Sequence, residues 1–422
     1  MVVSSDHMHS RSSEKIPHKV YQVPFERGYL EDMIAKTALK ESMFKLFSKV
    51  TEYTQTNWDS LLKSKELVED LRNADLIVYE GMAFAAMLVS ELHKIPRVSV
   101  FPVIPRPGGF LMFPSPVSYV PMSFTGFTSK MSFLQRVMNL GAYFALNAVF
   151  HFTTVRPLAA LKAKYNITPE TDIQEALNND ELVIVSSDFA LDYPQPLLPG
   201  INKENLSLFP GTQPFRKHSF FRRGMEGCNN KIGMYRFFNV PDTLFLTMGV
   251  ISNLLQVLIK RKRDSHAGHN SLFESGYHGV PMVAIPLFAD QFVNAKKAVD
   301  FGLALSLNLE TLSSKLLKET IEQVVYEPSF KKSASRISKL MQDKPRSPLE
   351  TTGDWIEYVL RHGGAQHLRA QVFNIPWYQY YLLDVIAFLV SAITVVVMVI
   401  WMTCRCFCRL CCKGTAKKSK HD

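Results

Sequence analysis

The sequence predicts an α/β fold with two domains, each built on a parallel sheet, followed by one transmembrane helix. In the first half, the strand-like runs 75–81 and 97–103 flank a helical stretch at 83–92, and such alternation indicates βαβ units. In the second half, the apolar run 282–287 has the length of a buried parallel strand. The uncharged residues 385–404 are long enough to cross about 30 Å of hydrocarbon.

Composition limits the function classes. The 422 residues are 47% hydrophobic and 20% charged, which suits two domains and a membrane span. The net charge of +10 is concentrated in two places, because residues 216–264 hold ten Lys/Arg against three acidic residues and residues 405–422 hold six against one. The rest of the chain is therefore close to neutral, and a basic segment without a matching fold does not predict nucleic-acid binding.

The cysteines do not predict disulfides or a metal site. Five of the six lie between Cys404 and Cys412, directly after the apolar span, and no histidine lies nearby. Juxtamembrane cysteines are commonly palmitoylated or remain reduced thiols. Because only Cys228 is left for the body, a disulfide framework is excluded.

The most informative stretch begins at Ser265. A polar turn containing Gly268 leads into a short helix that ends near Gly279, and Ser271 with Glu274 has the spacing of a capping box. Unpaired amides at such a helix N-terminus favour an anion, most often a phosphate. Taken singly, these residues could serve only to cap a helix or to face solvent. Their spacing together favours a ligand site.

A carboxylate and an amide follow the apolar run 282–287, at Asp290 and Gln291. In an open α/β sheet, ligands bind at the carboxyl edge of the strands. Asp290 could equally do no more than start the next helix. Counted from His266, an Asn-Ser pair stands at four and five residues, Glu at eight, and Asp-Gln at twenty-four and twenty-five.

This joint spacing resembles that of the UDP-glycosyltransferases, the membrane-bound family that includes the UDP-glucuronosyltransferases and the ceramide galactosyltransferase. The resemblance implies a GT-B fold of two facing Rossmann-like domains, with a UDP-sugar as co-substrate and no cofactor or metal. It implies pyrophosphate contacts at the start of the helix, ribose contacts from the glutamate, and sugar contacts from the last two residues. The implied UDP-sugar-binding residues are His266, Gly268, Asn270, Ser271, Glu274, Asp290 and Gln291.

The catalytic half of the resemblance is incomplete. The family reaction is inverting transfer, in which a histidine base oriented by a carboxylate deprotonates the acceptor hydroxyl. Glu80, after the predicted strand 75–81, takes the place of that carboxylate, although it could also be a capping or loop residue. Residues 1–19 are polar and lack the apolar core of a signal peptide. We expect the β-α unit that carries the histidine to be absent, and His7, His9 and His18 to lie in a leader without a strand.

The middle of the chain departs from the family. Residues 201–264 sustain neither alternation nor helical periodicity, and the basic run 260–263 stands where a buried strand should lead into His266. A divergent insertion and a wrongly joined exon are the two explanations, of which we favour the second. The predicted bounds are 1–200 for a truncated acceptor-binding domain, 201–264 for the anomalous segment, 265–365 for the UDP-sugar-binding domain, 366–384 for a stalk, 385–404 for the transmembrane helix and 405–422 for the tail.

Charges around the apolar span predict its orientation. Asp384 precedes the span and Arg405 follows it, so the positive-inside rule places the tail in the cytosol and the body in the lumen. Lys418 and Lys420 have the spacing of a dilysine retrieval signal. With the resemblance, this predicts a single-pass type I protein of the endoplasmic reticulum membrane.

The expected function is transfer of a hexosyl or glucuronosyl group from a UDP-sugar to the hydroxyl of a lipophilic acceptor. Residues 131–150 predict a nearly uncharged helix that is either core or, by the resemblance, a membrane-facing part of the acceptor path. Because no histidine is well placed as a base, we expect the chain as given not to turn over. The alternative is a non-catalytic membrane protein that associates with intact relatives, and the partners could include homo-oligomers or hetero-oligomers.

Overall fold

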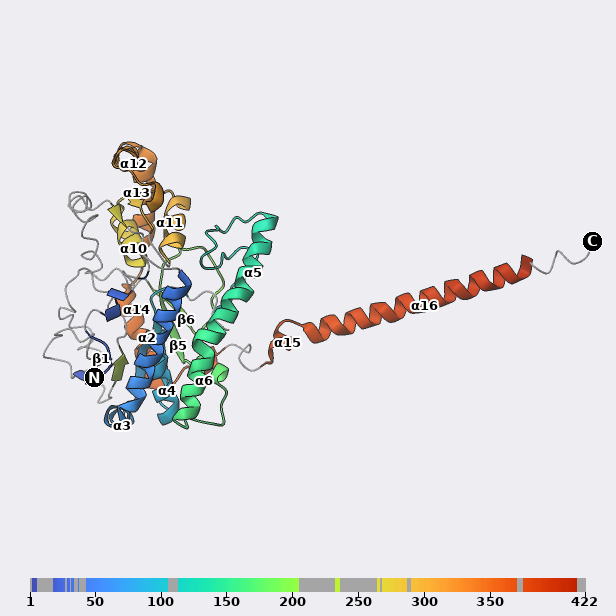
Figure 1. Ribbon diagram of the computed structural model, residues 1–422, viewed down its shortest axis with the longest axis horizontal. Coiled ribbons are helices and arrows are strands. Elements are labelled where there is room, and N and C mark those ends of the chain that lie inside the picture. Colours follow the sequence, from blue (N-terminus) through green and yellow to red (C-terminus); the bar gives the residue numbers. More distant parts are fainter. Residues whose placement is uncertain are drawn as a thin grey trace, which may run out of the picture. The chain divides into compact units, whose positions relative to one another are not determined.

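The computed structural model describes residues 2–5, 18–26, 29–30, 32–33, 37, 43–104, 113–204, 232–235, 264–265, 268–286, 290–369 and 375–415. The chain divides into two compact units, Met1–Arg369 and Ala370–Asp422. The first unit holds both sheets, and the second holds the long C-terminal helix (Figure 1).

The larger sheet has seven strands in the order β2-β1-β7-β3-β4-β5-β6. Every neighbouring pair is parallel. The strands are β1 Val2–Ser5, β2 His18–Tyr21, β3 Leu76–Glu80, β4 Arg97–Phe101, β5 Leu182–Ser186, β6 Ile201–Glu204 and β7 Ile232–Tyr235.

The strands predicted at 75–81 and 97–103 are confirmed as β3 and β4. β3, β4 and β5 are rich in Val, Ile and Leu, and nearly all of their residues are buried. Such apolar runs form parallel strands because helices cover both faces of the sheet. The helix between β3 and β4 is also confirmed, as α4 Phe84–His93.

Four strands of this sheet were not expected. β2 begins within the predicted leader, and β6 lies at the start of the segment predicted to be irregular. β1 lies within the residues predicted to be a strandless leader, and β7 lies within the segment predicted to be irregular. β7 pairs with β1 on one side and with β3 on the other, which is the place where the strand order changes direction. Both predictions were wrong because strands of four residues carry too little periodicity, and their hydrogen-bonding partners lie far away in the sequence.

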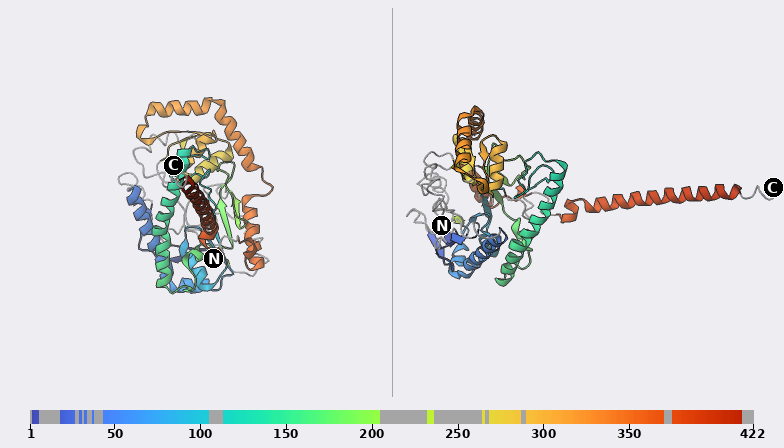
Figure 2. Two further views of the ribbon diagram at one scale, coloured as in Figure 1. Left: turned by 90° about the vertical axis from the view of Figure 1, so that its right-hand side faces the viewer. Right: turned by 45° about the horizontal axis from the view of Figure 1, so that its top comes forward.

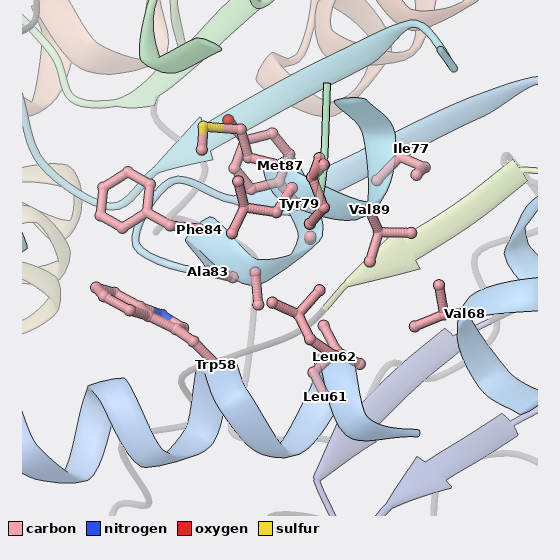
Figure 3. Close-up of a cluster of buried hydrophobic side chains, with 14 of the residues drawn as sticks. Trp58, Leu61, Leu62, Val68, Ile77, Tyr79, Ala83, Phe84, Met87 and Val89 are labelled. Atoms are coloured by element: carbon pink, nitrogen blue, oxygen red, sulfur yellow. The ribbon is translucent and has the colours of Figure 1, made fainter. Parts of the chain in front are cut away.

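One face of this sheet carries most of the N-terminal helices. The main core cluster lies here, and Figure 3 shows Trp58 pointing from α2 toward Phe84 of α4. The rings of Trp58 and Phe84 meet edge to face, with centroids 5.6 Å apart. The helices around this core are α2 Met43–Lys63, α3 Lys65–Leu71, α6 Arg156–Lys164 and α7 Ile173–Leu177.

The opposite face is covered by a helix from the far end of the body. α14 Pro348–His362 begins at a capping box formed by Ser347 and Glu350. Its Ile356 and Val359 pack against strand residues such as Leu76 and Ile184. The last helix of the body therefore crosses back and braces the N-terminal half.

The smaller sheet is parallel and has the order β10-β9-β8. Its strands are β8 Asp264–Ser265, β9 Met282–Ala284 and β10 Ala304–Ser306. Its helices lie together in Figure 1 and, coloured yellow to orange, in both views of Figure 2. They are α10 His269–His278, α11 Gln291–Asp300, α12 Ser314–Tyr326 and α13 Pro328–Gln342.

Helix α5 Phe133–Phe150 is not a core helix. Phe133, Leu134 and Phe144 are 75%, 64% and 63% exposed, and Asn139 is the one residue of α5 in the buried class. Asn139 accepts a hydrogen bond from the amide of Met122 at 2.7 Å and thereby fixes the preceding loop to the helix. A five-residue π-helix, η2 His151–Val155, continues α5.

The second unit is dominated by one helix. The short α15 Trp377–Tyr380 precedes α16 Leu383–Thr415. Within α16, the 25 residues Leu383–Phe407 are long and apolar enough to cross a membrane. The predicted apolar span at 385–404 lies inside this helix.

Candidate functional site

The first group of residues predicted to bind the UDP-sugar lies at the start of α10. Gly268 is the N-cap, in extended conformation and without a side-chain cap, and the first intrahelical bond runs from the amide of Leu272 to the carbonyl of Gly268 at 3.0 Å. The earlier amides have no partner within the helix. The predicted capping box is wrong, because Ser271 lies inside the helix and does not precede it. His266 lies outside the described residues.

Asn270, Ser271 and Glu274 share one side of α10. At 100° per residue they span one face, whereas the buried Leu272 and Phe273 lie on the opposite face. Asn270 and Glu274 are exposed, and Ser271 is half-buried. The helix therefore presents its polar side chains together on the side that the core does not use.

The second group lies at the start of α11. Asp290 is the N-cap residue and is exposed, and its Oδ2 accepts a hydrogen bond from the Asn294 side chain at 2.6 Å. Gln291, the first residue of the helix, is 4% exposed. The two neighbours therefore differ: Asp290 faces solvent, whereas Gln291 is enclosed by protein.

Both groups meet at one edge of the smaller sheet. β8 leads toward α10, β9 leads toward α11, and the two strands are parallel neighbours. The expectation that the strand before His266 is lost was wrong. β8 pairs Asp264 with Val283 and Ser265 with Ala284, so the turn before α10 is anchored to the sheet by a strand of two residues.

Glu80 is the last residue of β3 and is half-buried. Its carbonyl accepts a hydrogen bond from the amide of Ala83 at 2.7 Å, which starts the turn into α4. A Cβ on the next residue, Gly81, would lie 2.3 Å from the Phe101 ring. The backbone beside Glu80 is therefore closely packed, and Glu80 stands at the carboxyl edge of the larger sheet.

Two of the described histidines, His93 and His18, lie away from the carboxyl edge of the sheet where Glu80 stands. His93 ends α4 and contacts the carbonyl of Val68 at 2.9 Å, while His18 begins β2 at the opposite edge of the sheet. The reason for dismissing His7 and His9 was wrong, because β1 directly precedes them. Both lie outside the described residues.

Sequence reasoning missed the contacts that join the two sheets. The Nε2–H of His269 donates to the carbonyl of Ser186, the last residue of β5, at 2.8 Å. Lys297 of α11 forms a buried ion pair with Asp192 at 2.7 Å. The paired acidic residues after β5, Asp188 and Asp192, were a usable signal, since buried carboxylates need cationic partners.

A metal site does not emerge from the described ranges. They contain no cluster of three or more His, Cys, Asp or Glu side chains that could hold a metal ion. The groups gathered at the edge of the smaller sheet are helix N-terminal amides, hydroxyls, amides and carboxylates. Such a set suits a phosphorylated ligand with free hydroxyls.

Comparison with known proteins identifies the family. A family model described as "UDP-glucoronosyl and UDP-glucosyl transferase" matches residues 2–207 and 263–419. UDP-glucuronosyltransferase 2C1 of Oryctolagus cuniculus is 30% identical over 406 residues, which cover 86% of this chain and 80% of that protein. UDP-glucuronosyltransferase 2B15 of Homo sapiens is 28% identical over 472 residues, which cover 98% and 88%.

Among solved structures, a variant of Os79 from O. sativa in complex with UDP overlaps with a TM-score of 0.47 at 12% identity, covering 85% of this chain and 93% of that one. The family model and the sequence relatives establish the family. The chain belongs to the family of UDP-glucuronosyl and UDP-glucosyl transferases.

Proposed function

We propose that this chain binds a UDP-sugar at the edge formed by α10 and α11, for transfer of a hexosyl or glucuronosyl group to the hydroxyl of a lipophilic acceptor with inversion at the sugar. The first-turn amides of α10, with Asn270 and Ser271, would hold the pyrophosphate. Glu274 would accept hydrogen bonds from the ribose hydroxyls, and Asp290 would accept them from the sugar.

The observation that carries this proposal is the convergence of the two helix N-termini. β8 and β9 run parallel, so α10 and α11 begin at the same edge. Asn270, Glu274 and Asp290 are all exposed there. Gln291 is buried, and we therefore assign it to shaping the start of α11 as well as to the sugar contact expected from the family.

The exposed apolar surface of α5 supports a lipophilic acceptor. Phe133, Leu134 and Phe144 face solvent on a chain that also carries an apolar helix of membrane-spanning length. Exposed apolar surface of this kind marks a membrane or ligand interface. We assign the protein to the endoplasmic reticulum membrane, with its body in the lumen and its tail in the cytosol.

A second function is favoured by the position of the described histidines. Glu80 takes the place of the carboxylate that orients the base, yet His93 and His269 are engaged elsewhere by hydrogen bonds to backbone carbonyls. Without a base the reaction loses about 10²–10⁴ in rate. A non-catalytic protein that binds UDP-sugar and associates with intact relatives is consistent with this arrangement.

Calorimetry and a transfer assay separate the two functions. We expect UDP to bind to the purified chain, and Glu274→Ala to weaken UDP binding by roughly 1–3 kcal/mol because the ribose hydroxyls lose a charged acceptor. Asp290→Ala should change the preference among UDP-glucose, UDP-galactose and UDP-glucuronate and leave UDP affinity little changed. Equal loss of UDP affinity in both variants would contradict these roles.

Transfer to phenolic and ceramide acceptors is the second readout. UDP binding without transfer would favour the non-catalytic function. Transfer that Asp290→Ala abolishes would instead establish the enzyme, and the base would then have to be sought at His7 or His9, after β1.

A further inference from the structure

The segment that follows β5 is part of the core around α10. Leu191 is fully buried in the same cluster as Leu272 and Phe273 of α10. A Cβ on Gly276 of α10 would lie 2.3 Å from Cδ1 of Leu191. The helix therefore has a glycine at the point where a residue from the first half of the chain inserts.

A buried ion pair joins the same segment to α11. The Asp192 side chain is 4% exposed and that of Lys297 is 10% exposed, with Nζ and Oδ1 2.7 Å apart. Ser187 donates its hydroxyl to Oδ2 of Asp192 at 2.6 Å, and the amide of Tyr193 donates to Oδ1 at 3.1 Å. Three donors thus fix this carboxylate, so its position on the segment is well defined.

Both contacts act on helices that begin at the edge of the smaller sheet where the proposed UDP-sugar site lies. Lys297 lies seven residues after Asp290 on α11, close to two helical turns, and therefore on nearly the same side of the helix. His269, the first residue of α10, is fixed through its ring to the carbonyl of Ser186. The same short segment therefore holds the first turn of α10 at one end and the body of α11 at the other.

We propose that the segment 186–193 positions α10 and α11 for the UDP-sugar, with Asp192 and Lys297 as positioning residues that do not touch the ligand. This inference rests on the proposed donor site. It adds that the donor affinity of the second half of the chain depends on an ion pair with a residue of the first half.

The test compares two ion pairs made by the same segment. Lys297→Met removes the pair to α11, whereas Lys344→Met removes the 3.3 Å pair to Asp188 and leaves α11 untouched. We expect Lys297→Met to weaken UDP binding roughly tenfold or more, because misplaced contacts lose affinity steeply. Lys344→Met should stay within about twofold of the parent chain, as expected of a partly exposed pair.

A second variant separates positioning from loss of stability. Lys297→Met leaves Asp192 buried without its cation, which destabilises the fold. Asp192→Asn combined with Lys297→Met removes that charge, so the unfolding midpoint should return toward that of the parent chain. UDP affinity should remain weak, because the link to α11 is still absent. Recovery of UDP affinity together with stability would overturn the proposal.

Hydrogen exchange provides a readout that needs no ligand. In the full chain, Lys297→Met and the double variant should speed amide exchange in peptides covering α10 and α11, and Lys344→Met should not. Equal exchange in all variants would overturn the proposal. Absence of UDP binding by the parent chain would contradict the proposed donor site instead, and the exchange comparison would then decide the positioning role alone.

Discussion

Arg97 is a buried cation whose removal should strongly destabilise the body. It begins β4, is 2% exposed, and donates from Nε to Asp180 at 2.6 Å. It also pairs with Glu91 of α4 and donates to the carbonyl of Ala176 in α7. Burial alone would lower the pKa of Arg97, but Asp180, Tyr79 and Glu91 outweigh it and raise that pKa above its usual value.

The magnitude follows from the charges left behind. Arg97→Met leaves the carboxylates of Asp180 and Glu91 buried, with side chains 3% and 9% exposed. Tyr79 still donates to both oxygens of Asp180 at 2.9 Å, but Tyr79 is a neutral donor, since burial, and then Asp180, raises its pKa well above the usual value. Breaking a buried pair by removing one partner costs about 3–5 kcal/mol.

The assay is thermal unfolding of the full chain in detergent, followed by far-ultraviolet circular dichroism. At about 2 °C per kcal/mol for a large unit, the midpoint should fall by roughly 6–10 °C. The control is Arg72→Met, which removes a 2.9 Å pair to Glu69 whose side chains are 67% and 64% exposed, and which should cost less than about 1 kcal/mol. A midpoint for Arg97→Met equal to that of Arg72→Met would refute the reasoning.

Three further outcomes are expected. Burial would raise the pKa of Asp59, but Lys164 and other partners lower it to about 2. The stability lost in Asp59→Asn should therefore be largest above about pH 4 and vanish as the pH falls toward 2. Unfolding midpoints measured across this pH range test this. Gly276→Ala should lower the midpoint, because overpacking against Leu191 costs about 1–3 kcal/mol and outweighs the roughly 1 kcal/mol of helix propensity that alanine adds. A tag after Asp422 should be digested by protease in sealed microsomes when the chain is expressed behind a functional signal peptide, and protection of the tag would contradict the orientation.

The sequence by itself determined the features that depend on local interactions. The apolar runs of β3 and β4 appear as strands where the sequence predicts them. Helices α10 and α14 end where a glycine allows the left-handed conformation, at Gly279 and Gly363. The apolar span and the spacing of residues from Gly268 to Gln291 were also visible, because each depends on neighbours within a few helical turns.

The tertiary structure alone decided the features whose partners are distant in the chain. β1, β7 and β8 are two to four residues long and become strands only through hydrogen bonds to remote segments. Whether α5 is core or surface could not follow from its composition, since an apolar helix can face protein or membrane alike. The contacts of Leu191 and Asp192 with α10 and α11 join residues about a hundred positions apart. The ion pair between Asp192 and Lys297 becomes buried only once both sheets have formed.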